Sequence, residues 1–226
     1  MKCLSIIFSL ICGFALTTHA HIPNQEFEQW WTVGNCQVPT DYFTYNLISS
    51  GSFYPVSRDT SHYPSTIGSS SIRLENKISL LPANESKGII VSSLQITSMP
   101  SYQTPSFKIN GHPNFLTGYY KYAPQNGDTM WIAIKLFLNG SIVSQGSFYS
   151  KNATSIWNSF IIPLSSYSSA DSAEIIIAAY NADQPNKLPL GNSVLNVDNL
   201  NFDNLISSLE DAEAQNDFCI FPNPTI

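Results

Sequence analysis

The sequence predicts an all-β fold, an antiparallel β-sandwich of the jelly-roll type. Short runs of β-branched and aromatic residues recur along the chain, and Gly, Pro, Asn, Asp and Ser separate them. Helical periodicity is nearly absent. Many short strands with turn signals at such spacing are typical of sandwiches and jelly rolls.

Eight of these runs are expected to be strands. They are, in order, 70–76, 87–93, 115–123, 129–139, 141–149, 157–164, 173–181 and 193–202. Asn126 followed by Gly127, and Asn139 followed by Gly140, accept the positive φ that tight hairpin turns require. These two turns therefore bound the run 129–139.

The run 129–139 has one wholly apolar face. Its even positions are Met130, Ile132, Ile134, Leu136 and Leu138. Because side chains alternate along a strand, these residues are predicted to face the core. The odd positions, Trp131 and Lys135 among them, form a mixed face, and an outer face needs no tryptophan for stability.

Residues 1–20 have the features of a secretory signal. Lys2 precedes a short apolar run, and the small residue Ala20 precedes the expected cleavage before His21. The run is too short for a comfortable transmembrane span. We expect a protein exported into solution or to the cell surface. Residues 21–205 are expected to form one domain, with 206–226 as a flexible tail.

The charge balance argues against polyanionic partners. The formal net charge is −6, and removal of Lys2 with the signal leaves 9 basic and 16 acidic residues, or −7. A nucleic-acid or anionic-membrane partner would need basic patches. Cys36 and Cys219 remain after cleavage, in a compartment where a disulfide persists. Whether these two residues meet is left open, as is the oligomeric state.

Several motifs together resemble known domains. The segment NQEFEQWW resembles the GxFExW opening of jelly-roll carbohydrate-binding modules. HYPSTIGSSSIRLEN, LTGYYKYAPQNGD and SVLNVDNLNF resemble the carbohydrate metabolism domain family of exported Bacteroidetes proteins, which is similar to galactose-binding-like jelly rolls. The resemblance spans residues 21–202. The tail FCIFPNPTI resembles the start of a type IX secretion sorting domain, or is only a Pro- and Asn-bearing tail.

The resemblance implies a structural calcium site. Glu28 and Asp198 are expected on the first and last strands, where related modules bind Ca²⁺ with an acid from each. Carboxylates from distant segments supply the oxygen ligands that Ca²⁺ prefers. Glu26 could replace Glu28. The alternative is that all three acids are simply solvated, since no acid-rich loop completes the set.

The tyrosines before the Asn126 turn suggest a ligand surface. Tyr120 and Tyr122 share one face of their strand, and Tyr119 and Lys121 share the other. One pair must lie near the core, and alternation alone leaves open which. The other pair is expected to join Trp131 and Lys135 in an exposed platform. Such platforms stack against the apolar faces of sugar rings.

The polar segment 51–71 is expected to be a long loop that contacts ligand. It brings together Arg58, Asp59, His62 and Tyr63. Loops at the end of a sandwich often carry binding residues, and His62 and Tyr63 are candidates. The alternative reading is that His62 is an ordinary turn residue.

No catalytic motif stands out. The sequence has no GxSxG, HExxH or CxxC motif and no phosphate-binding glycine loop. We therefore expect a non-catalytic carbohydrate-binding module whose partner is a glycan. A glycoside hydrolase on the same fold is one alternative, with its paired carboxylates drawn from Asp171, Glu174, Asp183 and Asp198. A surface adhesion module that binds protein is another.

Overall fold

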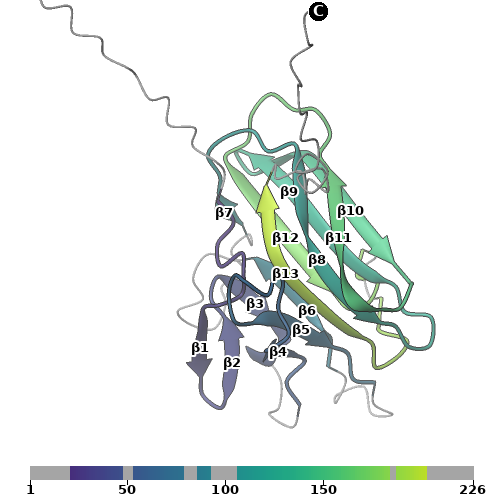
Figure 1. Cartoon of the computed structure of the whole chain (residues 1–226). Coiled ribbons are helices and arrows are strands. Elements are labelled where there is room, and N and C mark those ends of the chain that lie inside the picture. The colour runs from purple at the N-terminus through teal and green to yellow at the C-terminus, as the bar shows by residue number, and fades with distance from the viewer. Residues whose placement is uncertain (1–20, 48–52, 79–85, 93–105, 184–186, 203–226) are drawn as a thin grey trace, which may run out of the picture.

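Two antiparallel sheets packed face to face build the domain (Figure 1). The computed structural model describes residues 21–47, 53–78, 86–92, 106–183 and 187–202. The prediction of an all-β jelly-roll sandwich is confirmed, and no α-helix occurs in these ranges. None of the described residues forms a helix that could cross a membrane. The expected signal 1–20, the tail 206–226 and Cys219 lie outside the described ranges.

Each sheet draws its strands from both halves of the chain. The six-stranded sheet contains β3 (Tyr42–Thr44), β6 (Ile89–Ser92), β7 (Phe107–Lys108), β9 (Met130–Leu138), β10 (Ser141–Ser150) and β12 (Ser172–Ala178). The five-stranded sheet contains β4 (Val56–Asp59), β5 (Ser71–Glu75), β8 (Phe115–Ala123), β11 (Thr154–Pro163) and β13 (Val194–Phe202). A separate hairpin contains β1 (Trp30–Val33) and β2 (Cys36–Pro39), and one 3-10 turn, η1 (Tyr45–Leu47), follows β3.

The strand order explains the jelly-roll topology. The six-stranded sheet runs β10-β9-β12-β6-β3, with β7 also pairing with β12, and the five-stranded sheet runs β11-β8-β13-β5-β4. The chain changes sheet between β8 and β9, between β10 and β11, and between β12 and β13. Sequence neighbours therefore often lie in opposite layers.

All eight expected strands are present, with ends that shift by a few residues. The strand signals in the sequence did not predict β1 to β4 and β7, because these strands are only two to four residues long. The expected long loop 51–71 is interrupted by β4, whose sequence VSRD has an unpatterned, mostly polar character. A strand of this kind at a sheet edge is fixed by its partner β5 rather than by its own composition.

The two Asn-Gly turns behave differently. Asn139 and Gly140 have φ of 51° and 79° and join β9 to β10 in a hairpin, as predicted. Asn126 and Gly127 also have positive φ, but the connection 124–129 carries the chain from one sheet to the other. β8 and β9 are therefore not paired, so the tyrosine run 119–122 and Trp131 lie in different sheets and cannot form the expected platform together.

The core lies between the two sheets, and the prediction for β9 is confirmed. Met130, Ile132, Ile134 and Leu136 are fully buried, whereas Leu138 at the strand end is half-buried. Their partners across the core include Ile72, Leu74, Leu116, Phe160, Ile162, Leu195 and Val197. Burial of one such side chain contributes roughly 1.5–3 kcal/mol, so this layer supplies much of the stability.

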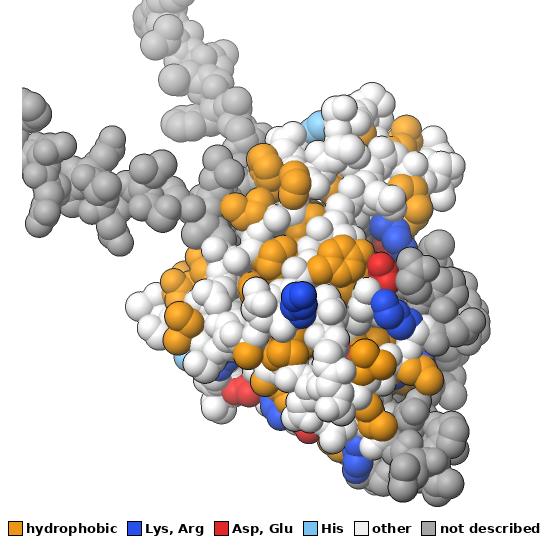
Figure 2. Space-filling model, turned by 90° about the vertical axis from the view of Figure 1, so that its right-hand side faces the viewer, with side chains coloured by type: hydrophobic (Ala, Val, Ile, Leu, Met, Phe, Trp, Pro, Cys, Tyr) orange, Lys and Arg blue, Asp and Glu red, His pale blue; other side chains and the backbone are white. Residues whose placement is uncertain are grey.

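The surface reflects the low charge of the chain, in which 12% of residues are charged. On the side of the molecule shown in Figure 2, hydrophobic side chains are scattered among uncharged polar groups, with few charged side chains between them. This side of the molecule therefore offers polar and apolar surface rather than a strongly charged one.

Ile134→Asp should prevent folding. The change would place a carboxylate with no partner in the middle of the core, at a cost of several kcal/mol against a total stability of roughly 5–15 kcal/mol. Ile142→Asp is the matched control, because Ile142 on the neighbouring strand is 52% exposed. Circular dichroism and thermal unfolding of both variants test this expectation. A cooperative melting transition for Ile134→Asp near that of the parent would contradict it.

Candidate functional site

The pleat of β8 divides the tyrosines between core and surface. Tyr120 and Tyr122 are 8% and 1% exposed and belong to the core cluster. The Tyr122 hydroxyl donates to the Ala179 carbonyl over 3.0 Å. Tyr119 and Lys121 alternate with them and point to the outer face of the five-stranded sheet, where both are half-buried. The alternative left open by the sequence is thus resolved.

A tryptophan from β11 joins this outer face. Phe160 and Ile162 of β11 point into the core, and Ser159 pairs with Tyr119. Trp157 lies on the outer side, where the Lys121 Nζ is 4.8 Å from the centre of its ring. A lysine held over an indole face makes a favourable cation–π contact.

Tyr63 completes a group of three rings. It lies in the connection after β4, 36% exposed, and its ring centre is 4.1 Å from that of Tyr119 and 6.4 Å from that of Trp157. Tilted pairs at such distances are favourable ring contacts. We call Tyr63, Tyr119 and Trp157 the aromatic patch.

A buried carboxylate holds the backbone of Tyr63 in place. The Tyr63 N–H donates to Asp198 Oδ2 over 2.7 Å, and the Asn199 N–H donates to Asp198 Oδ1 over 2.8 Å. Asp198 lies on β13 and is 2% exposed. The contact joins residues 135 positions apart, and it fixes the loop that carries the most exposed ring of the patch.

Polar groups surround the aromatic patch on the β4 side. The Lys121 Nζ donates to the Ser61 Oγ over 2.6 Å, and the Ser61 N–H donates to Asp59 Oδ1 over 2.8 Å. Asn196 Nδ2 donates to the other Asp59 oxygen over 3.0 Å. This chain of contacts orients an ammonium, a hydroxyl, a carboxylate and an amide beside the rings.

Asp198 titrates far from its usual range. Burial raises its pKa to about 7, and the negative charges of Glu26 and Glu28 add to this effect. The hydrogen bonds from Tyr63 and Asn199 act in the opposite direction and offset only part of it. The carboxyl therefore changes charge near neutral pH.

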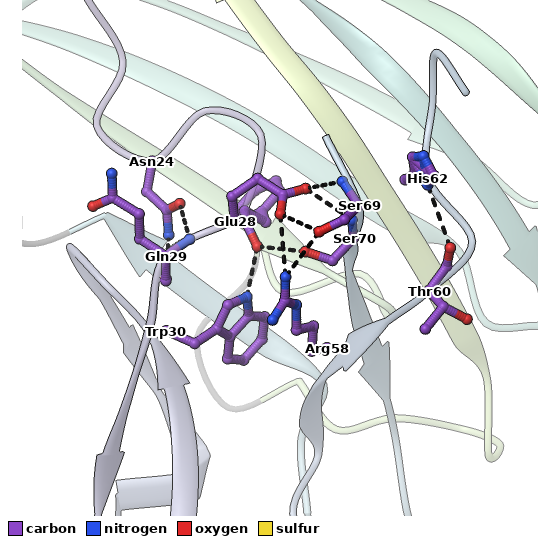
Figure 3. A network of polar contacts seen from close by, with 10 residues as sticks. Asn24, Glu28, Gln29, Trp30, Arg58, Thr60, His62, Ser69 and Ser70 are labelled. Atoms are coloured by element: carbon purple, nitrogen blue, oxygen red, sulfur yellow. Dashed lines mark hydrogen bonds and ion pairs between the residues drawn. The ribbon is translucent and has the colours of Figure 1, made fainter. Parts of the chain in front are cut away.

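Glu28 holds a second loop, as Figure 3 shows. The N–H groups of Ser69 and Ser70 donate to Glu28 Oε1 over 2.6 and 2.8 Å. The Ser69 hydroxyl and Arg58 donate to Oε2 over 2.7 and 3.1 Å. Burial alone would raise the pKa of Glu28, but the hydrogen bonds from Ser69 and Ser70 outweigh it and lower the pKa to about 2.

The expected calcium site was tested against these contacts. Glu28 lies in the turn before β1 rather than on a strand, with its oxygens occupied by four donors, and both oxygens of Asp198 accept N–H groups. Within the described ranges, no group of three or more His, Cys, Asp or Glu side chains is placed to hold a metal. As arranged, these residues do not fit a Ca²⁺ cage. Calcium binding would require the 69–70 segment to release Glu28, and it stays a prediction.

Trp131 and Lys135 belong to the other sheet, which corrects the expected platform. Trp131 points away from the core as predicted, but it is only 8% exposed, because it packs with Ala133, Ile176, Ala178 and Tyr180 in a second apolar cluster. Lys135 forms an ion pair with Glu174, with Nζ 2.8 Å from Oε1. The prediction of one exposed surface that joins Trp131 to the tyrosines of β8 is therefore wrong. Ligand contact by Trp131 or by Lys135 stays a prediction.

His62 lies next to the aromatic patch in sequence. Its Nδ1 is 3.3 Å from the Thr60 carbonyl oxygen, and its Nε2 is buried with no hydrogen-bond partner. Figure 3 shows it beside Thr60, away from the Glu28 network. A role for His62 in ligand binding stays a prediction.

Sequence reasoning missed Trp157, Ser61 and Asn196. For Trp157 a signal was present: with Phe160 and Ile162 in the core, alternation places an odd-numbered neighbour on the outer face. Ser61 and Asn196 gave no such signal, because Ser61 depends on its contact with Lys121 of β8 and Asn196 on its contact with Asp59 at the end of β4.

Comparison with known proteins supports the fold. No protein-family model matches the sequence, and no curated protein matches it. The structure is similar to a candidate glycoside hydrolase from Bacteroides thetaiotaomicron, with a TM-score of 0.58 and 11% identity over 81% of this chain and 70% of that chain. A candidate glycoside hydrolase from Bacteroides vulgatus has a TM-score of 0.55 and 16% identity over 78% of this chain and 95% of that chain.

A family 16 carbohydrate-binding module is also similar, with a TM-score of 0.37 and 14% identity over 66% of this chain and 85% of that chain. That TM-score is too low for a shared fold to be inferred from it. At the identities of the two Bacteroides proteins, the likeness shows the fold alone.

The two carboxylates predict opposite slopes of stability with pH. The pKa of Glu28 is lowered to about 2, so its contribution is present above pH 4.5 and is lost as the pH falls toward 2. The pKa of Asp198 is raised to about 7, so the folded state holds a proton that the unfolded state releases, and stability falls as the pH rises from about 4 to 7. Urea unfolding from pH 3 to pH 8 measures both slopes.

Single variants separate the two effects. Asp198→Asn should flatten the curve between pH 4 and 7, whereas Glu28→Gln should flatten it below pH 4.5. Curves that run parallel to the parent in both variants would show that neither carboxylate produces the pH dependence.

The calcium prediction has a direct test in thermal unfolding. A cation bound only by the folded state stabilises that state by mass action, so excess chelator should lower the melting temperature and added Ca²⁺ should restore it. Asp198→Ala should remove this response. An unchanged melting curve in chelator rejects the site.

Proposed function

We propose that this domain binds a glycan without transforming it, and that the aromatic patch is the binding surface. The observation that carries the proposal is the meeting of three partly exposed rings from separate segments on one outer sheet face. If the rings only covered the sheet, the strand residues Tyr119 and Trp157 would be sufficient. Tyr63 comes from a loop, contacts both rings, and has its backbone held by the buried Asp198.

The chemistry beside the rings suits a saccharide. Tyr63, Tyr119 and Trp157 offer apolar faces for sugar C–H groups, and Lys121, Asp59 and Asn196 offer donors and acceptors for hydroxyls. Similarity in fold to two candidate glycoside hydrolases supports a role in carbohydrate chemistry.

Export from the cell is part of the proposal. The signal-like features of residues 1–20 support a secreted or surface-attached protein, and the PNP sequence of the tail is consistent with a sorting segment. The mass of the protein recovered outside the cell tests export, because cleavage before His21 would give a chain that begins at His21.

Glycoside hydrolysis is the second candidate function, and Asp198 is the observation that favours it. A carboxyl with a pKa of about 7 has the protonation state that a general acid needs. Asp198 is 2% exposed, however, and both of its oxygens accept backbone N–H groups, so it serves the loop rather than a substrate. Release of reducing ends from a bound polysaccharide would favour the enzyme.

Trp157→Ala and Tyr63→Ala should each weaken glycan binding at least tenfold with little change in melting temperature. A shallow polar-aromatic site is expected to bind with a Kd in the ~micromolar to millimolar range, and loss of a central ring typically costs over ~1.4 kcal/mol. Affinity electrophoresis against soluble polysaccharides measures the change.

Ile156→Ala is the matched control, because Ile156 precedes Trp157 on the same strand and is 70% exposed. It should bind as the parent does. Glycan binding that survives loss of both rings would exclude the aromatic patch as the site.

A further inference from the structure

A second surface with saccharide-binding chemistry lies on the outer face of the six-stranded sheet. The edge strand β10 and its neighbour β9 are in register, so that Tyr149 lies opposite Trp131, Ser147 opposite Ala133, and Gln145 opposite Lys135. Tyr149 is 44% exposed, and Ser147 and Gln145 are exposed as well. Three rows of side chains therefore lie on this face of the strand pair, and the β10 members are the exposed ones, since Trp131 and Ala133 are 8% and 2% exposed.

Hydrogen bonds orient the polar groups of these rows. The Tyr149 hydroxyl donates to Asp183 Oδ2 over 3.2 Å, and the Trp131 Nε1 donates to the Ser147 Oγ over 3.2 Å. The Lys135 Nζ donates to Glu174 Oε1 over 2.8 Å. Groups held in this way lose little further freedom when a ligand binds.

One carboxylate oxygen at this surface has no partner. Asp183 Oδ1 is buried from solvent and forms no hydrogen bond, although the other oxygen of the same group binds Tyr149. A buried acceptor without a donor costs free energy, and an arriving hydroxyl would satisfy it. The unsatisfied oxygen therefore lies beside the exposed ring of Tyr149. Sugar-binding sites combine an aromatic ring with a hydrogen-bond acceptor in this way.

The middle row is built from small side chains. Ala133 and Ser147 lie between the ring row, Tyr149 and Trp131, and the row of Gln145 and Lys135. Residues two apart on a strand are roughly 7 Å apart, so the rows on either side of Ala133 stand about 13 Å from each other along the strand. Ala133 is only 2% exposed, so a ligand ring would rest over Ser147 on β10, with Tyr149 and Gln145 at its two ends.

We infer that this strip is a second saccharide site, formed by Tyr149, Ser147, Gln145, Lys135 and Asp183, with the buried Trp131 orienting the Ser147 hydroxyl. Tyr149 stacks on the face of a sugar ring, Asp183 Oδ1 accepts a hydroxyl, and Ser147, Gln145 and Lys135 bind others. The carboxylates of Asp183 and Glu174 disfavour an acidic sugar, so the ligand is a neutral one. This inference rests on the proposed function in one respect, which is that both concern glycan binding. The two sites share no residue, so each can be tested without the other.

The two sites would act on different glycan chains. The aromatic patch lies on the outer face of the five-stranded sheet, and this strip lies on the outer face of the other sheet, with the core between them. One domain would therefore connect two polysaccharide chains, and binding to a dense matrix would gain from both contacts.

Stoichiometry and cross-linking test the inference. The mature chain is first screened by affinity electrophoresis against a soluble β-glucan, a xylan, a galactomannan and an amylose, and an oligosaccharide of the strongest binder is then titrated by calorimetry. The parent should bind two oligosaccharides per chain and precipitate the polysaccharide. Tyr149→Ala, Asp183→Ala and Trp157→Ala should each retain one site and lose precipitation, and Tyr149→Ala combined with Trp157→Ala should bind at least a hundredfold more weakly.

Ile142→Ala is the control on β10, 52% exposed and outside the strip. It should keep both sites, and melting curves confirm that each variant is folded. A single site that is lost in Trp157→Ala and unchanged in Tyr149→Ala and Asp183→Ala would overturn the second site and leave the proposed function intact. A single site lost only in the strip variants would support the strip and overturn the aromatic patch, and no binding by any variant or the parent would overturn both.

Discussion

The pleat of β8 is the constraint on which the candidate site depends. Tyr120 and Tyr122 are needed to fill the space between the sheets, so Tyr119 and Lys121 have no alternative but the outer face. β11 and β13 flank β8 and follow the same alternation. The outer face therefore receives Trp157 on one side, and on the other Asn196 opposite Lys121 and Asp198 opposite Tyr119.

Carboxylates, rather than loop packing alone, hold the connections around this sheet. Asp198 binds the backbone of Tyr63, Glu28 binds Ser69 and Ser70, and Asp128 accepts the N–H groups of Leu190 and Gly191. Each acid lies far in sequence from the loop it holds. Hydrogen bonds from N–H groups to an ionised acceptor such as Glu28 are stronger than neutral ones, which lets a polar loop stay ordered without an apolar anchor. Precise placement of Tyr63 follows from this arrangement.

The sequence predicts the fold well and the site only in part. Alternation in β9 identifies Ile132, Ile134 and Leu136 as core residues because a strand buried on one face has a period of two. The same rule gives the correct side of the sheet for Trp131, but not its burial, which results from Tyr180 and Ile176 packing beside it.

In β8 both faces carry aromatic residues, so the alternation of side chains could not show which face is buried. No local pattern shows that Tyr63 will meet Asp198, or that β8 and β9 part into separate sheets across a turn that resembles a hairpin turn. These contacts depend on strand order in three dimensions, which composition does not encode.

The strand order also determines when the domain can fold. β5 lies beside β13, with Ile72 opposite Val197, and β6 lies beside β12, with Val91 opposite Ile176. Neither sheet is complete until the last strands have been synthesised, and at roughly 5–20 residues per second the N-terminal strands wait on the order of ten seconds for their partners. Pairing over such separations is slow to nucleate. The apolar faces of β5 and β6 are thus exposed during synthesis. The chain is expected to fold late, and other factors can keep it extended until its C-terminal strands have been synthesised.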